Sequence, residues 1–231
     1  MAAERCWVVI PAAGVGQRFG GDFPKQYTKL RGRSLLDHCL ATFLSWPTTF
    51  KIVVALSASD RQFSESDFAT HPKIVKVEGG TERVNSVLNA LAYIDLQADD
   101  SDWVMVHDAA RPMLQTQDID VLWRARSQYR AAILARPISD TIKRANGAGV
   151  IDRTVSREGL WGAQTPQMAK VEDLCSALRA GLQAGHNITD EASALEAQGL
   201  EVGLVEGPAY NIKVTLPDDL HLANLWLERQ Q

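Results

Sequence analysis

Short apolar runs alternate with amphipathic helical patterns along this chain, and the alternation constrains the fold more than any other feature. Runs typical of buried strands lie at residues 6–11, 51–57, 73–80, 102–112 and 131–137. The helical patterns between them lie at 34–47, 81–94 and 116–128. Parallel strands need crossover connections, which are usually helices, so this order predicts an α/β fold with a Rossmann-like, mostly parallel sheet flanked by helices. Because the runs are apolar almost throughout, we expect helices on both faces of the sheet.

The C-terminal part of the sequence resumes this pattern. We expect helices near 170–184, from Thr189 to about 198 and from Pro217, and strands at 201–207 and 211–215. Short polar side chains that accept a hydrogen bond from the first helical turn are preferred N-caps. The candidates for that role are Ser34, Thr81, Thr116 and Thr189.

Residues 138–160 interrupt the alternation. Two polar, β-prone segments flank the letters NGAG there, which is a hairpin signal. An isolated hairpin is marginal in water, so we expect it to pack on something, and a partner subunit is a candidate. Because no linker or internal repeat is present, we predict one domain, 1–231, with a protruding arm at about 138–160.

A glycine-rich loop follows the first strand, in the stretch PAAGVGQRFGGDFPKQY at 11–27. Glycine N–H groups can close around phosphate oxygens, and Arg18 and Lys25 add two cations. Lys25 is not preceded by the glycine of a Walker A motif, and the dinucleotide fingerprint needs a glycine one position before Gly20. The loop therefore suits a triphosphate, whose developing charge two cations can meet. A surface loop with two solvated cations is the alternative on these residues alone.

The stretch VHDAARP at 106–112 also falls at a strand end. Asp108 suits a single carboxylate that holds Mg²⁺ beside phosphates, and the planar fork of Arg111 suits a second phosphate. The alternative is an Asp–Arg pair that braces a turn. His107 is expected to point back into the core.

Composition excludes several classes of function. The formal net charge is −4, so no global basic field favours nucleic acid, and any anionic ligand must be held by local cations. No apolar run is long enough for a membrane span, and the first residues are too short for a signal or transit peptide, so we expect a cytoplasmic protein. Three scattered cysteines make neither a disulfide framework nor a zinc site.

Six blocks, taken in order, resemble the 2-C-methyl-D-erythritol 4-phosphate cytidylyltransferases of the non-mevalonate isoprenoid pathway. The blocks lie at 11–27, 79–87, 106–112, 160–167, 189–196 and 211–215. The resemblance implies a nucleotidyltransferase that converts CTP and methylerythritol phosphate into CDP-methylerythritol and pyrophosphate, with Mg²⁺ or another divalent cation.

The resemblance also implies roles for particular residues. Arg18 and Lys25 would stabilise the transition state, while Ala12, Ala13, Gly14, Gly80 and Ser86 would surround the nucleotide. The implied substrate positions are Asp108, which would also contact the metal, Arg111, Thr189 and Lys213, together with Thr141 and Arg157 on the arm. The arm positions would reach the neighbouring subunit's site, so a homodimer is expected. On spacing alone, Thr189 would be a helix cap, Lys213 a solvated charge, Ser86 a solvent-facing residue and Arg157 a brace for the arm.

Three other functions are possible, and for each a sequence feature argues against it. A ribitol-5-phosphate cytidylyltransferase shares the nucleotide loop, and the block at 189–196 and the arm favour methylerythritol phosphate over it. A non-catalytic nucleotide-binding regulator would not need the transition-state cations Arg18 and Lys25 or the carboxylate Asp108. An NAD-dependent oxidoreductase is disfavoured by the glycine spacing.

Overall fold

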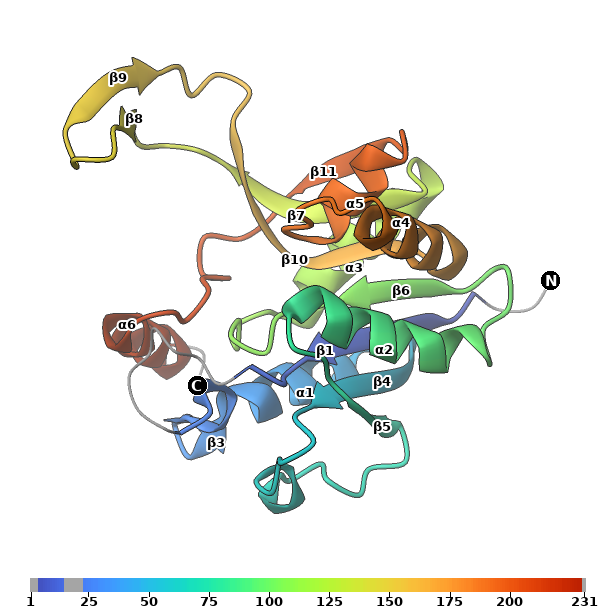
Figure 1. Ribbon diagram of the computed structural model, residues 1–231. Helices are drawn as coiled ribbons and strands as arrows, with labels where there is room; N and C mark the ends of the chain where they lie inside the picture. Colours follow the sequence, from blue (N-terminus) through green and yellow to red (C-terminus); the bar gives the residue numbers. More distant parts are fainter. Residues whose placement is uncertain (1–3, 15–22, 230–231) are drawn as a thin grey trace.

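A seven-stranded mixed sheet forms the centre of the computed structural model, which describes residues 4–14 and 23–229 (Figure 1). Its strand order is β11-β7-β10-β6-β1-β4-β5. The strands are β1 (Cys6–Pro11), β4 (Thr49–Leu56), β5 (Ile74–Glu78), β6 (Trp103–Val106), β7 (Ala131–Pro137), β10 (Trp161–Lys170) and β11 (Val202–Glu206). All neighbouring pairs are parallel except the two made by β10, so the predicted mostly parallel α/β sheet is confirmed.

Helices cover both faces of this sheet, as the continuous apolar runs predict. Val8 and Ile10 of β1 pack in one buried cluster with α1 (Leu35–Ser45) and α3 (Thr116–Arg124). Trp7 and Val9 of the same strand pack in the opposite cluster, with the remaining helices of the core. Those helices are α2 (Arg83–Asp95), α4 (Val171–Gln183) and α5 (Glu191–Ala197). Successive strand residues point to opposite faces, so a strand covered on both sides must be apolar throughout.

Helix caps follow the prediction at only one of four positions. Ser34 caps α1, since its Oγ accepts the N–H of Asp37 at 3.0 Å. The N-caps of α2, α3 and α5 are instead Glu82, Gln115 and Asp190, one residue away from the predicted threonines. In α5 the Asp190 carboxylate accepts the N–H of Ser193 at 3.0 Å, a stronger cap than a neutral hydroxyl because the acceptor is charged.

Strand β10 is the element that the sequence pattern did not predict. It runs antiparallel between β6 and β7, and its pairing with β7 is irregular between Ala163 and Gln167. Pro166 lies in that irregular stretch, where it has no ladder hydrogen bond to lose. Conversely, the strand expected at 211–215 is not assigned; this segment meets the body through a hydrogen bond from Val214 N–H to the Ala110 carbonyl.

The predicted hairpin is present and stands well away from the body of the molecule (Figure 1). It consists of β8 (Ile142–Ala145) and β9 (Ile151–Val155), paired antiparallel. The Asn146 side chain accepts the N–H groups of Ala148 and Val150, and Gly149 takes a positive φ of 77° at the turn. Val150 and Ile151 at the tip are exposed at 60% and 61%, so this arm leaves apolar surface in solvent.

The last helix, α6 (Pro217–Glu228), begins with proline at its first position, as predicted. It packs beside a small two-stranded ribbon of β2 (Lys29–Leu30) and β3 (Arg33–Ser34). Among the described residues, no helix combines the length and apolarity that crossing a membrane requires.

Candidate active site

A pocket of about 240 Å³ lies where β1 and β6 end and α2 begins. In sheets of this class ligands gather beyond the carboxyl ends of the strands, so this is the expected edge. Eight of the residues singled out in the sequence line it: Ala12, Ala13, Gly14, Lys25, Gly80, Ser86, Asp108 and Lys213. We call it the first pocket.

Close backbone packing shapes the wall of the first pocket before α2. Gly80 N–H donates to Ser86 Oγ at 3.0 Å, and Ser86 is only 3% exposed, so it does not face solvent. A Cβ on Gly79 would lie 2.4 Å from the Ala13 Cβ, and one on Gly80 would lie 2.2 Å from the Asn85 Cβ. Gly79 is therefore needed for the loop to approach the residues after β1, and Gly80 for it to approach the first turn of α2.

Lys25 enters the first pocket from a short 3-10 helix, Lys25–Tyr27. Its Nζ donates to the Val214 carbonyl at 2.7 Å, which ties the loop to the segment before α6. Gln26 Nε2 donates to the Ala12 carbonyl at 2.7 Å and holds the same helix against the end of β1. Arg18, the other predicted cation of the loop, lies outside the described residues.

A second pocket, of about 230 Å³, adjoins the first. Arg83, Asp108 and Lys213 line both, so the two pockets share a wall. The other predicted residues in the second pocket are Arg111 and Thr189. Two anionic groups placed in the two pockets would thus meet across one set of charged side chains.

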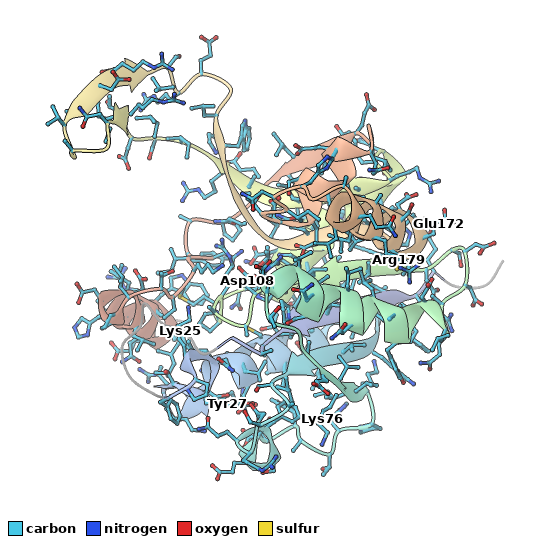
Figure 2. The ribbon with its side chains drawn as sticks, viewed as in Figure 1. Lys25, Tyr27, Lys76, Asp108, Glu172 and Arg179 are labelled. Atoms are coloured by element: carbon cyan, nitrogen blue, oxygen red, sulfur yellow. The ribbon has the colours of Figure 1, made fainter. Side chains whose placement is uncertain are left out.

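Asp108, which Figure 2 labels, is the residue of this shared wall that three cationic side chains surround. Its Oδ1 accepts Arg83 Nε at 3.0 Å, its Oδ2 lies 2.8 Å from Lys213 Nζ, and Arg111 Nε lies 3.9 Å from Oδ2. Burial acts to raise the pKa of this carboxyl, but the charges of Arg83, Lys213 and Arg111 together outweigh it and hold the pKa well below its usual range. Asp108 is therefore ionised at neutral pH.

The backbone around Asp108 is fixed by a directional chain of hydrogen bonds. His107 Nε2 lies 3.1 Å from the Arg111 carbonyl, which can only accept, so Nε2 carries the proton. Nδ1 then accepts the Thr165 hydroxyl at 3.1 Å, and Thr165 Oγ1 accepts Asp108 N–H at 3.0 Å. Burial lowers the pKa of His107 to about 4, so the ring is neutral and lies in the core, as predicted.

Arg111 is also braced by the segment before α6. Its Nη1 donates to the Asn211 carbonyl at 2.6 Å, and the buried Asn211 amide donates to the Thr165 carbonyl at 2.8 Å. Arg111 therefore lines the second pocket from a fixed position, while its buried Nε has no hydrogen-bond partner among the described residues. Thr189 lies at the rim, where its backbone N–H donates to Ser193 Oγ at 3.2 Å.

Two of the predicted site residues are not brought to these pockets. Thr141 and Arg157 lie exposed on the arm, outside the described lining of both pockets. In the part of the chain that the structure describes, no hydrogen bond or ion pair joins their side chains to a residue of either pocket, so their predicted role would need a second subunit.

The donor set for a metal is small. Among residues 4–14 and 23–229, no group of three or more His, Cys, Asp or Glu side chains could hold a metal ion. Asp108 is a carboxylate beside both pockets, and each of its oxygens already meets a cation. Mg²⁺ commonly takes one or two carboxylates and completes its shell with water and phosphate, so Asp108 fits as a single protein ligand of a metal that arrives on phosphates.

Several residues that build the site were not singled out from the sequence. Arg83 lies in the block at 79–87 and Glu191 in the block at 189–196, and the structure joins them as an ion pair. Thr165 and Asn211 lie in two further blocks. The blocks themselves marked all four, but only spatial contact reveals what each one holds.

The match to a known family spans nearly the whole chain. Residues 6–229 match the family model described as IspD, 2-C-methyl-D-erythritol 4-phosphate cytidylyltransferase. A curated relative of that name from Vibrio vulnificus (strain CMCP6) is 51% identical over 224 residues, which cover 96% of this chain and 94% of the relative. One from Hahella chejuensis is 47% identical over 230 residues, 99% and 95% of the two chains.

Solved structures of proteins with these names also share the fold of this chain. The Francisella tularensis 2-C-methyl-D-erythritol 4-phosphate cytidylyltransferase superposes with a TM-score of 0.84 at 39% identity, covering 96% of this chain and 99% of that one. A structure titled 4-diphosphocytidyl-2C-methyl-D-erythritol synthase has a TM-score of 0.85 at 34% identity, covering 98% and 100%. The chain therefore belongs to the 2-C-methyl-D-erythritol 4-phosphate cytidylyltransferase family.

Proposed function

We propose that this chain transfers a cytidylyl group from CTP to 2-C-methyl-D-erythritol 4-phosphate, giving 4-diphosphocytidyl-2-C-methyl-D-erythritol and pyrophosphate in isoprenoid precursor synthesis. Family membership supports the reaction. The structural observation that carries it is the wall of Arg83, Asp108 and Lys213 shared by two adjoining pockets. Such a wall lets one phosphorylated substrate approach the phosphates of another.

The first pocket is assigned to the nucleotide. Lining residues Ala12, Ala13, Gly14, Gly80 and Ser86 would surround the pyrimidine nucleoside, and Lys25, which lines the same pocket, would meet its phosphates. Arg18 is assigned to the same phosphates by its place in the loop. The second pocket, with Arg111, Thr189 and Lys213, is assigned to the phosphate of the polyol.

The chemical step needs cations more than a base. An ionised phosphate oxygen of methylerythritol phosphate attacks the innermost phosphorus of CTP, and the new P–O bond forms as the bond to the pyrophosphate oxygen breaks. Pyrophosphate leaves with that electron pair. Because the nucleophile is already an anion at neutral pH, no side chain has to remove a proton. The barrier is largely repulsion between anions, which Lys25 and Arg18 would reduce most in the pentavalent transition state.

A divalent cation, Mg²⁺ in particular, is assigned to the triphosphate with Asp108 as its protein ligand. Bound there, it would neutralise phosphate charge. The cations around Asp108 disfavour a metal that arrives alone, so metal and CTP should bind together. Calorimetry tests this: CTP should bind more weakly when EDTA is present, and Mg²⁺ without CTP should give no heat of binding. A metal that binds equally well without CTP would contradict the assignment.

The arm is assigned to a homodimer interface. It stands away from the body of the molecule (Figure 1) and carries exposed Val150 and Ile151 at its tip. Thr141 and Arg157 are exposed on the same arm and are not among the described residues that line either pocket. Both residues would then complete the second pocket of the partner. In this proposal residues 1–231 form one nucleotidyltransferase domain with the arm at 138–160. A cytoplasmic location, expected from the sequence, stays a prediction.

A pyrophosphate-release assay tests the function. Purified protein with Mg²⁺ is given each of the four ribonucleoside triphosphates together with methylerythritol phosphate. We expect release with CTP, and none with CTP alone. Release with ribitol 5-phosphate in place of methylerythritol phosphate would favour the rival cytidylyltransferase. Nucleotide binding without release from either polyol phosphate would favour a non-catalytic regulator.

A further inference from the structure

Arg83 is the first residue of α2 and belongs to the wall that both pockets share. Its Nε donates to Asp108 Oδ1 at 3.0 Å. Its two terminal nitrogens donate to the two oxygens of Glu191, Nη1 to Oε1 at 2.7 Å and Nη2 to Oε2 at 3.0 Å. All three nitrogens of the guanidinium are therefore engaged, and the group has one orientation.

Glu191 is buried, at 2% exposure, and is not among the described residues that line either pocket. It is the first residue of α5, directly after the rim residues Thr189 and Asp190. Arg83 directly follows the loop that shapes the nucleotide side. The Arg83–Glu191 ion pair thus connects the start of α2, which follows a loop of the first pocket, to the start of α5, which follows a loop of the second pocket.

The charges explain why a second acid is needed. Arg83, Lys213 and Arg111 surround Asp108, which cannot neutralise three cations alone. Burial opposes the charge of Arg83, but Glu191 and then Asp108 outweigh this effect and raise the arginine's pKa. With Glu191 matched to Arg83, the positive charge that remains belongs to Arg111 and Lys213, which line the second pocket.

We propose that Glu191 is a positioning residue for the cytidylyl transfer, which holds Arg83 so that Asp108 keeps its place when a substrate phosphate draws Lys213 away. A phosphate in the second pocket competes with Asp108 for Lys213 Nζ. Arg83 is then the cation that still holds the Asp108 carboxylate. The two hydrogen bonds from Arg83 to Glu191 keep the guanidinium from moving toward the substrate phosphate or with the carboxylate. This inference rests on the proposed function of the two pockets.

The test is Glu191→Gln, which keeps shape but places a side-chain NH₂ against a guanidinium N–H, so the paired contact is lost. A displacement of about 1 Å at a reacting centre can cost about 10²-fold. We therefore expect kcat/KM for methylerythritol phosphate to fall about 10²-fold. The Kd for CTP measured with EDTA, where Asp108 holds no metal, should change by less than about twofold. Glu191→Asp, which keeps the charge, should recover part of the loss.

Asp102→Asn is the matched control. Asp102 is 1% exposed, and its carboxylate accepts hydrogen bonds from Arg5 Nε at 3.0 Å and Nη2 at 2.7 Å. It lies directly before β6, whereas Asp108 lies beyond the other end of that strand. Side chains of Arg5 and Arg83 are equally exposed, at 29%. Asp102→Asn should lower the melting temperature at least as much as Glu191→Gln, and leave kcat/KM per folded molecule within about twofold of wild type.

Two further variants test whether Glu191 acts through Arg83. Arg83→Lys should lower kcat/KM for methylerythritol phosphate about as much as Glu191→Gln does. In the double variant kcat/KM should fall no further than in the less active single variant, because the two residues act as one unit. Additive losses, or kcat/KM for Glu191→Gln within about twofold of wild type, would overturn the proposal.

Crystal structures of Glu191→Gln separate this inference from the proposed function. In crystals soaked in inorganic phosphate, which competes with Asp108 for Lys213, the Arg83 guanidinium and the Asp108 carboxylate should be displaced from their positions in wild-type crystals soaked in the same way. Unmoved side chains overturn the positioning role whatever the enzyme's substrates prove to be. Wild-type protein that fails to turn over CTP with methylerythritol phosphate refutes the proposed function instead.

Discussion

Lys213 Nζ lies 2.8 Å from Asp108 Oδ2, so the cation assigned to the substrate phosphate and the carboxylate assigned to the metal are partners in the free protein. The Lys213 side chain is 44% exposed, while that of Asp108 is 10% exposed. The lysine can therefore turn toward an arriving phosphate, whereas the carboxylate stays in the wall. In the free protein, oppositely charged side chains of the site pair with one another, and we expect a bound substrate phosphate to replace Asp108 as the partner of Lys213.

Replacing Lys213 tests this exchange. Lys213→Met keeps the aliphatic stem and removes the charge, so KM for methylerythritol phosphate should rise about 10- to 100-fold, the range of one charge-assisted hydrogen bond. Steady-state kinetics at saturating CTP measure it. Lys76→Met, a loss of an exposed lysine on β5, is the control and should change nothing. An unchanged KM in Lys213→Met would remove Lys213 from the phosphate site.

The loop cations should act on the transition state more than on binding. Lys25→Ala should lower kcat about 10²- to 10³-fold and weaken CTP binding far less, and the same is expected of Arg18→Ala. Turnover and calorimetric Kd for CTP give the two quantities, with the exposed Lys29→Ala as control. Equal losses in both would mean that these cations stabilise only the bound ground state.

Folding stability should depend on pH through His107. Its pKa of about 4 in the folded chain lies below the ordinary 6.5, so the unfolded chain binds more protons between these values. Stability is then fully present above about pH 6.5 and falls by about 3 kcal/mol as pH drops to about 4. Urea unfolding followed by tryptophan fluorescence measures it.

The variant His107→Gln isolates the contribution of this histidine. Its amide can still donate and accept but does not titrate in this range, so the slope between the two pH values should shrink by most of that amount. Part of the slope should persist, because burial also lowers the pKa of His38. A slope equal to that of wild type would show that protonation of His107 is not what destabilises the fold.

The arm can be tested by mixing two inactive variants. Lys25→Ala damages a subunit's own site, and Arg157→Ala damages the arm that would reach its partner. If the arm acts in the partner's site, a co-expressed mixture contains heterodimers with one intact site, and activity should return to about one quarter of wild type. An arm that acts within its own chain would restore nothing. Ile151→Asp should yield monomers in analytical ultracentrifugation, with each subunit still folded.

Much of the fold was predictable because its signals are local. The apolar runs of β1, β4 and β7 and the helical periods between them depend on neighbours a few residues away. Strand β10 was not predictable, because Pro166 and the polar letters beside it break the strand pattern and only pairing with β6 and β7 makes the segment extended. Three predicted helix caps were wrong by one residue, because the actual N-caps Glu82, Gln115 and Asp190 are each adjacent to a threonine, a residue type that also favours the N-cap position.

The sequence by itself determined the α/β layering, the edge of the sheet where polar residues gather, and the family. Only the tertiary structure decided which of those residues meet. Arg83 reaches Asp108 across 25 positions and Glu191 across 108. The pairing of charges so distant in the chain depends on strand order and on burial, which strengthens such pairs by excluding water, and neither can be derived from the spacing of residues along the chain.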